Sequence, residues 1–275
     1  MIVLALDTST DMLACALVRM EGRAVEVLSS CDHMCRRMAN VELVSTCKEA
    51  LAAADLAMAD LDAVLVGRGP GSFTGVRIGI ATAKGLACGA SLPLYGASAL
   101  DAMAWSAHAA GVRGTLAVAG DAMRGEVYPG IYRLDEAGAH RTFAAETVVK
   151  ADACVAEWAA RADAGELVLT GNGLAKYRAK FEAAGFGDGR FAPEDAWWPT
   201  GEGLARAAAE AGSFSRLPRF FWMELSMVAE NSSVWRSAGV CSTILVTSGR
   251  KPMSSMRSAS SSTRICTCDR STSLR

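Results

Sequence analysis

A glycine-rich segment limits what this chain can fold into more than any other feature of the sequence. The segment reads Gly67-Arg68-Gly69-Pro70-Gly71-Ser72-Phe73-Thr74-Gly75-Val76-Arg77-Ile78-Gly79. The apolar run Ala63–Val66 before it is typical of a buried strand, and the residues after it have helical spacing through about Ala87. Because glycine permits positive φ and close backbone approach, the segment predicts a tight strand-to-helix turn.

The turn itself has two interpretations. A glycine loop that opens a helix is a common anion site, which makes Gly69, Gly71 and Ser72 candidate phosphate ligands. The other interpretation is a strained turn with Thr74 as the helix cap. The glycine-rich segment is not a Walker loop under either interpretation, because no Gly-Lys-Ser or Gly-Lys-Thr follows at the required spacing. The residues alone leave both interpretations open.

A second polar turn lies near the N-terminus. Ile2–Leu6 and Leu13–Val18 read as strands, and Ala24–Ser29 as a third, so a meander is expected. The first two are joined by a turn that begins at Asp7 and Thr8, whose oxygens and N–H groups could hold a phosphate and its metal. Turns rich in Asp, Ser and Thr also form by local hydrogen bonding alone.

The order of expected elements divides the chain into a first lobe, 1–111, a second lobe, 112–212, and a tail, 213–275. The first lobe continues with a helix over 39–53, whose apolar positions are Val41, Val44, Cys47 and Leu51, and later with a helix capped by Ser98. The second begins with a hairpin. The tail is low-complexity, and we expect it to be disordered or to derive from a frameshifted gene.

Composition excludes several classes of protein. A net charge of −1 provides no general basic field for nucleic acid. The start lacks a signal peptide and no apolar run is long enough for a membrane span, so a cytoplasmic protein with reduced cysteines is expected. The three histidines show no paired metal spacing and no Gly-x-Ser-x-Gly occurs, so we expect neither a metal site nor catalytic residues.

Small residues recur every four positions in the helix after the glycine loop. They are Gly75, Gly79, Ala83 and Ala87. One face of this helix therefore lacks bulk, which suits close approach either by a partner's helix or by the chain's own sheet.

Several segments together resemble one family. Ile2–Thr10, Val66–Gly79 with Ala81–Ala87, Pro93–Leu100 and Asp121–Tyr128 are similar to the TsaB family, also called YeaZ, and the resemblance covers about residues 1–211. It implies an actin-like, two-lobed α/β fold of the sugar kinase, Hsp70 and actin class.

The resemblance also implies a function. Such a chain would be the non-catalytic dimerisation subunit that pairs with a TsaD-type catalytic paralogue, with a TsaE-type ATPase as a further partner, for threonylcarbamoylation of adenosine 37 in tRNA. Contact with tRNA would come through the complex, and a homodimer of the isolated chain is left open. The dimer contact of the family predicts that Gly75, Gly79, Ala83 and Ala87 form the partner interface.

Asp7, Thr8, Gly69, Gly71 and Ser72 would then be a relic phosphate site with no cofactor beyond weak nucleotide binding. The rival hypothesis is an active enzyme, an actin-like ATPase or sugar kinase that uses Asp7 and the Gly67–Gly75 loop. Two departures from the family pattern stand out. Ala39 and Val44-Ser45 replace a His and a Leu-Pro in the first long helix, and the tail lacks the family's closing motif.

Overall fold

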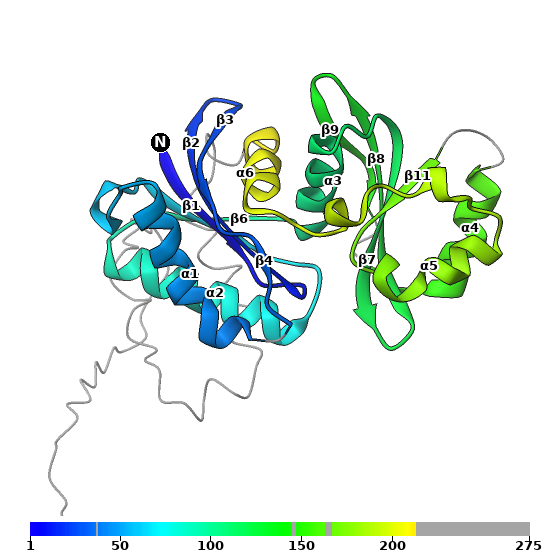
Figure 1. The fold of residues 1–275 in the computed structure, drawn as a ribbon, viewed down its shortest axis with the longest axis horizontal. Coiled ribbons are helices and arrows are strands. Elements are labelled where there is room, and N and C mark those ends of the chain that lie inside the picture. Colours follow the sequence, from blue (N-terminus) through cyan, green and yellow to red (C-terminus); the bar gives the residue numbers. More distant parts are fainter. Residues whose placement is uncertain (37, 145–146, 163–166, 213–275) are drawn as a thin grey trace, which may run out of the picture. The chain divides into compact units, whose positions relative to one another are not determined.

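A computed structural model gives the fold (Figure 1). It describes residues 1–36, 38–144, 147–162 and 167–212. Within these ranges the chain forms two mixed sheets flanked by helices. The predicted tail, 213–275, lies outside the described residues, so its disorder or frameshift stays a prediction.

The first sheet has the strand order β3-β2-β1-β5-β6, with β4 paired to the start of β2. Its strands are β1 (Ile2–Asp7), β2 (Met12–Glu21), β3 (Ala24–Ser30), β4 (His33–Met34), β5 (Ala63–Gly67) and β6 (Leu94–Ala97). The first three form the expected antiparallel meander, whereas β5 and β6 run parallel to β1. The carboxyl ends of β1 and β5 therefore meet at one edge.

Helices cover both faces of this sheet. Side chains alternate along β1, so that Leu4 and Leu6 pack with α1 (Ala39–Ala53) and α2 (Phe73–Gly89). Val3 and Ala5 join a second core with α3 (Ala99–Ala109) and α6 (Gly201–Glu210). A 3-10 turn, Met58–Asp60, lies between α1 and β5.

The second sheet repeats the pairing of the first. Its elements are β7 (Gly114–Met123), β8 (Glu126–Asp135), β9 (Gly138–Ala144), β10 (Val149–Lys150), α4 (Ala151–Ala162), β11 (Leu167–Thr170) and α5 (Leu174–Ala183), followed by 3-10 turns at Asp188–Arg190 and Glu194–Trp197. The central strand β7 pairs with β8 and β11, as β1 pairs with β2 and β5 in the first sheet. The next strand, β8, pairs with β9 and β10, as β2 pairs with β3 and β4. The chain thus contains two copies of one βββ-β-α-β unit.

Helix α6 was expected in the second lobe but packs on the first sheet and against α3. Asp32, after β3, fixes its start: Oδ1 accepts from the backbone N of Gly201 at 3.1 Å and of Cys15 at 2.8 Å. Burial raises the pKa of Asp32, and these two backbone hydrogen bonds lower it. The chain therefore returns to its first sheet before residue 213.

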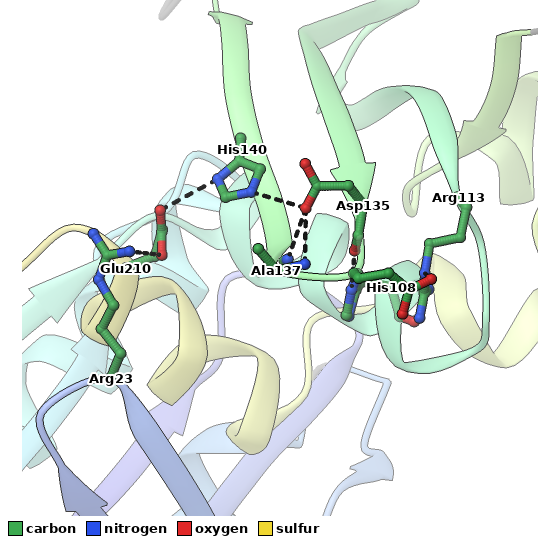
Figure 2. Close-up of polar contacts among 9 residues, drawn as sticks. Arg23, His108, Arg113, Asp135, Ala137, His140 and Glu210 are labelled. Carbon is green, nitrogen blue, oxygen red and sulfur yellow. Dashed lines mark hydrogen bonds and ion pairs between the residues drawn. The ribbon is translucent and has the colours of Figure 1, made fainter.

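A polar network joins the far end of α6 to two hairpins (Figure 2). His140 on β9 lies between Glu210 and Asp135, with its Nδ1 at 3.3 Å and its Nε2 at 3.2 Å from their carboxylate oxygens. Glu210 also pairs with Arg23, in the β2–β3 turn, at 3.5 Å. The network ties segments from both halves of the sequence to one helix end.

Two helix starts differ in detail from expectation. The N-cap of α2 is Ser72, whose Oγ accepts from the N of Gly75 at 3.3 Å, and not Thr74. Ser98 does precede α3, but in the described structure its side chain makes no capping bond and instead accepts from Nη2 of Arg141 at 3.0 Å. Within the same described part of the chain, every helix is too short or too polar to cross a membrane.

Candidate functional site

The two polar turns singled out in the sequence meet at one edge of the first sheet. The turn after β1 carries Asp7, Thr8 and Ser9, and the glycine loop leaves β5 beside it. The parallel pairing of β1 and β5 brings them together, because parallel strands end at the same edge. All three side chains of the turn are buried.

Asp7 is sealed under the glycine loop. Its Oδ1 accepts from the N of Ser9 at 2.6 Å, while among the described residues Oδ2 of Asp7 and Oγ of Ser9 have no hydrogen-bond partner. A Cβ at Gly67 would overlap the Asp7 carboxylate, so glycine is required there. Burial raises the pKa of Asp7 above its usual value, and Ser9 partly offsets this.

The remaining glycines close the loop onto the turn. A Cβ would overlap the carbonyl oxygen of Ser9 from Gly71 and that of Thr8 from Gly75, and would come within 2.6 Å of Thr8 Oγ1 from Gly79. Thr8 Oγ1 donates to the carbonyl oxygen of Gly75 at 2.7 Å. The glycine spacing therefore serves direct packing of α2 and its loop on the β1–β2 turn.

The closed loop does not form a phosphate cradle in this structure. The N–H of Ser72, which would face an anion, donates to the carbonyl oxygen of Ser9 at 2.7 Å, and the Ser72 hydroxyl accepts from Gly75. Gly69 has φ +83° and its carbonyl accepts from the N of Ala99, at the start of α3. The structure thus brings Asp7, Thr8, Gly71 and Ser72 together, but the Ser72 N–H already donates within the chain. Gly69 faces α3 instead.

The small-residue face of α2 lies against the chain's own sheet. Gly75, Gly79, Ala83 and Ala87 are all buried, and the two alanines belong to the core with Leu6 and Val66. Of the two arrangements that the sequence left open for this face, the structure has packing on the chain's own sheet. The expected interface residues are therefore covered within this chain and do not reach its surface.

A different apolar surface lies on the outer side of α1 and at the start of α2. The exposed apolar residues in this region are Met34, Met38, Val41, Val44 and Phe73; they are called the α1–α2 face below. Helices α1 and α2 contact each other along this side of the sheet (Figure 1). Phe73 is 64% exposed, and the Arg77 guanidinium lies 3.5 Å from its ring centre.

The predicted helix over 39–53 is present, but Val41 and Val44, two of the four apolar positions that predicted it, lie on its exposed side. The buried positions of α1 include Leu43, Cys47 and Leu51, whereas Val41 is 63% and Val44 48% exposed. Val44 has helical spacing to Cys47 and Leu51, but Leu43 has it as well, and Leu43 is the residue that shares their buried stripe. A helix with apolar residues on both sides was the available signal for a second contact surface.

The second lobe has an acidic residue at the position that corresponds to Asp7. Asp121 lies near the end of β7, as Asp7 ends β1, and its N donates to Oδ1 of Asn172 at 2.9 Å. Its carboxylate forms an ion pair with Lys176 of α5. The sequence pattern did not single out this pair, because the two residues are distant in the chain.

The described residues contain no group of three or more His, Cys, Asp or Glu side chains that could hold a metal ion. Each histidine has other partners. Nε2 of His33 lies 2.9 Å from Oε2 of Glu42, and Nε2 of His108 lies 2.9 Å from the carbonyl oxygen of Asp135. His140 lies in the network of Figure 2.

Duplicated mixed sheets with strand order β3-β2-β1-β5 and β9-β8-β7-β11, each flanked by helices, define an actin-like α/β protein. Comparisons with known proteins identify the family. The family model described as "TsaD: tRNA N6-adenosine threonylcarbamoyltransferase" matches residues 33–184. A solved structure from Pseudomonas aeruginosa, of an uncharacterised protein with similarity to peptidase YeaZ, is 28% identical with a TM-score of 0.64, over 78% of this chain and 93% of that one.

Curated relatives point the same way. The tRNA threonylcarbamoyladenosine biosynthesis protein TsaB of Escherichia coli is 37% identical over 148 residues, which are 54% of this chain and 62% of that protein. TsaB of Haemophilus influenzae is 41% identical over 127 residues, 46% of this chain and 51% of that protein. The match thus spans less than two thirds of either relative. The chain belongs to the family of that TsaD model and, within it, to the TsaB (YeaZ) group.

Proposed function

We propose that this chain is a non-catalytic scaffold subunit in the biosynthesis of threonylcarbamoyladenosine on tRNA, and that it pairs with a TsaD-type catalytic protein. The names of the E. coli and H. influenzae relatives support the assignment to this biosynthetic process. A TsaE-type ATPase would be a further partner, and adenosine 37 of tRNA would be reached through the complex. A cytoplasmic location follows from this role.

The α1–α2 face is the observation that carries the pairing. Five apolar side chains from β4, the β4–α1 connection and the two adjacent helices are exposed there. Burial of apolar surface stabilises association by about 25 cal/mol per Å², and an aromatic ring beside an arginine, as in Phe73 and Arg77, is typical of interface centres. The occupant that we assign to this face is the TsaD-type protein.

The sealed glycine loop supports the non-catalytic part of the proposal. A phosphate or its metal could reach Asp7 only if the loop at Gly67 and Gly71 moved away from the turn. That movement would break the hydrogen bond of Ser72 to Ser9 and uncover the core beneath α2. The free energy needed for such an opening works against nucleotide binding.

Paired surface variants test the interface. Val41→Asp with Val44→Asp should weaken binding to the TsaD-type protein of the same genome by at least about 30-fold, since each buries a carboxylate in an apolar contact. Phe143→Asp is the matched control, because Phe143 is 49% exposed on β9 of the second lobe. Calorimetry measures affinity, and circular dichroism checks folding. Undiminished binding by the folded double variant would reject the α1–α2 face.

The second candidate, an actin-like ATPase or sugar kinase, rests on one observation. Oδ2 of Asp7 and Oγ of Ser9 are buried polar atoms without a partner among the described residues, as a displaced ligand would leave them. Calorimetry with ATP and Mg²⁺ separates the candidates. Weak or absent binding without turnover supports the scaffold, whereas micromolar affinity that Asp7→Asn abolishes, with steady hydrolysis by the isolated chain, supports the enzyme.

A further inference from the structure

Two cysteines from different elements touch in the first core. Cys15 lies on β2 and Cys47 on α1, 32 positions apart, with their sulfur atoms at 4.0 Å. Cys15 is fully buried and Cys47 is 3% exposed. The Cys15 thiol donates to the sulfur of Cys47. The two thiols therefore face one another across the contact between the sheet and its outer helix.

The contact makes the two thiols unequal. The hydrogen bond from Cys15 lowers the pKa of Cys47, because it stabilises the thiolate of the acceptor, although burial opposes the effect. The same hydrogen bond, followed by burial, raises the pKa of Cys15. Since the thiolate is the nucleophile in thiol chemistry, Cys47 is the residue of the pair that reacts first with an oxidant.

We propose that Cys15 and Cys47 form an oxidisable dithiol, which hydrogen peroxide converts to a disulfide that joins β2 to α1. The Cys47 sulfur attacks the peroxide, whose O–O bond breaks, and gives a sulfenic acid and one water. The Cys15 sulfur then attacks the sulfenic sulfur, and the hydroxyl leaves with a proton as a second water. The dithiol loses two electrons and two protons, and the peroxide is reduced to two waters.

Geometry and position allow this step. A disulfide has a bond length of about 2.05 Å, so the sulfurs must approach by about 2 Å, within reach of side-chain rotation and a small shift of α1. Helix α1 is an outer helix with Val44 exposed on its far side. A peroxide can therefore reach Cys47 through local opening of one helix, and the rest of the core need not unfold.

The neighbouring cysteine is a weaker candidate for the pair. The N of Cys31 donates to the carbonyl oxygen of Cys15 at 2.8 Å, so Cys31 lies beside it on the sheet. Desolvation and nearby negative charge raise the pKa of Cys31, but the pKa of Cys15 is raised as well, so the choice between the two rests on the sulfur–sulfur contact. A metal is not the better explanation of this cluster, since the described residues provide no group of metal-holding geometry. The 4.0 Å contact therefore singles out Cys15 and Cys47.

Peptide mapping of the full chain tests the proposal. The chain is treated with hydrogen peroxide, free thiols are blocked, and protease digestion with mass spectrometry identifies linked peptides. We expect one dominant link between the Cys15 and Cys47 peptides, reversed by dithiothreitol, and a thermal midpoint raised by about 5 °C in the oxidised chain. The wild-type map does not depend on whether any variant folds.

Two variants give the matched comparison. Cys47→Ser should abolish the link and the rise in midpoint, whereas Cys154→Ser should retain both. Cys154 is a suitable control because it is buried in the second lobe, where burial raises its pKa to about 12. The proposal is overturned if Cys15 and Cys47 stay reduced in peroxide-treated wild type, or if either is linked mainly to another cysteine.

Discussion

The Thr8 hydroxyl donates a hydrogen bond of 2.7 Å to the carbonyl oxygen of Gly75, 67 residues further along the chain. Both residues are buried. The bond holds the first turn of α2 on the turn that follows β1, and the glycines of the loop allow the two backbones to touch. The glycine motif, on this view, is a packing device at the sheet edge.

Substitution of Gly75 tests this packing role. A Cβ there would overlap the backbone oxygen of Thr8, which cannot rotate away, so Gly75→Ala should destabilise the chain by about 3 kcal/mol or more. Gly85→Ala in the same helix is the control. Its Cβ would meet none of the described atoms within 4 Å, so it should be neutral or stabilising by up to about 1 kcal/mol. Equal effects in urea unfolding would contradict the packing role.

The buried carboxyl of Asp7 predicts a pH-dependent stability. Because burial raises its folded pKa above 3.8, the folded state holds the proton more tightly, so this contribution is present at low pH and is lost as pH rises through the folded pKa. Asp7→Asn should remove that loss. Between pH 4.5 and pH 7.5 the free energy of unfolding should fall less in the variant than in wild type. A larger fall in the variant would contradict the assigned cost of burying the Asp7 carboxylate.

Two hydroxyls in the first turn of α2 should differ in their effect on stability. Ser72 caps the helix through its bond from Gly75, so Ser72→Ala should cost about 1 kcal/mol. Thr74 is exposed and lies inside the helix, so Thr74→Ala should cost less than about 0.5 kcal/mol. Urea denaturation of both variants gives the comparison, and a larger loss from Thr74→Ala would restore Thr74 as the cap.

His33 should titrate above its ordinary range. The hydrogen bond to Glu42 is the main cause of its raised pKa, and Glu42→Gln should lower the value measured by NMR. Protonation of His33 stabilises the folded chain below pH 6.5, and that contribution is lost as pH rises through the folded pKa. Both side chains are more than one third exposed, so the effect on stability should stay below about 1 kcal/mol. An unchanged His33 titration in Glu42→Gln would contradict the assignment.

Local pattern was sufficient for most of the fold. The limits of α1 and the three strands of the meander follow from apolar spacing, and the parallel pairing of β5 follows from the helix before it. The short strands β4 and β10 were missed, because two-residue strands have no period of their own. The place of α6 on the first sheet was also missed, since it depends on tertiary contacts such as that of Asp32 with Gly201.

The candidate site was only half predictable. The resemblance to the family placed Asp7 and the glycine loop in one site, but the residues alone could not distinguish a phosphate cradle from a closed turn. That distinction depends on where the Ser72 N–H points, which is a matter of backbone geometry. The α1–α2 face was missed for a related reason. Val41 and Val44 fit one helical stripe with Cys47, but in the structure Leu43 lies in the buried stripe with Cys47, and the two valines are exposed.

Reconstituted tRNA modification tests the scaffold function most directly. The TsaD-type and TsaE-type proteins of the same genome are combined with unmodified tRNA and a threonylcarbamoyl donor, with and without this chain, and modified adenosine is measured by mass spectrometry. The account predicts efficient modification only when the chain and the TsaD-type protein are both present, and none by the chain alone. Modification at the full rate without this chain, or by this chain without the TsaD-type protein, would contradict it.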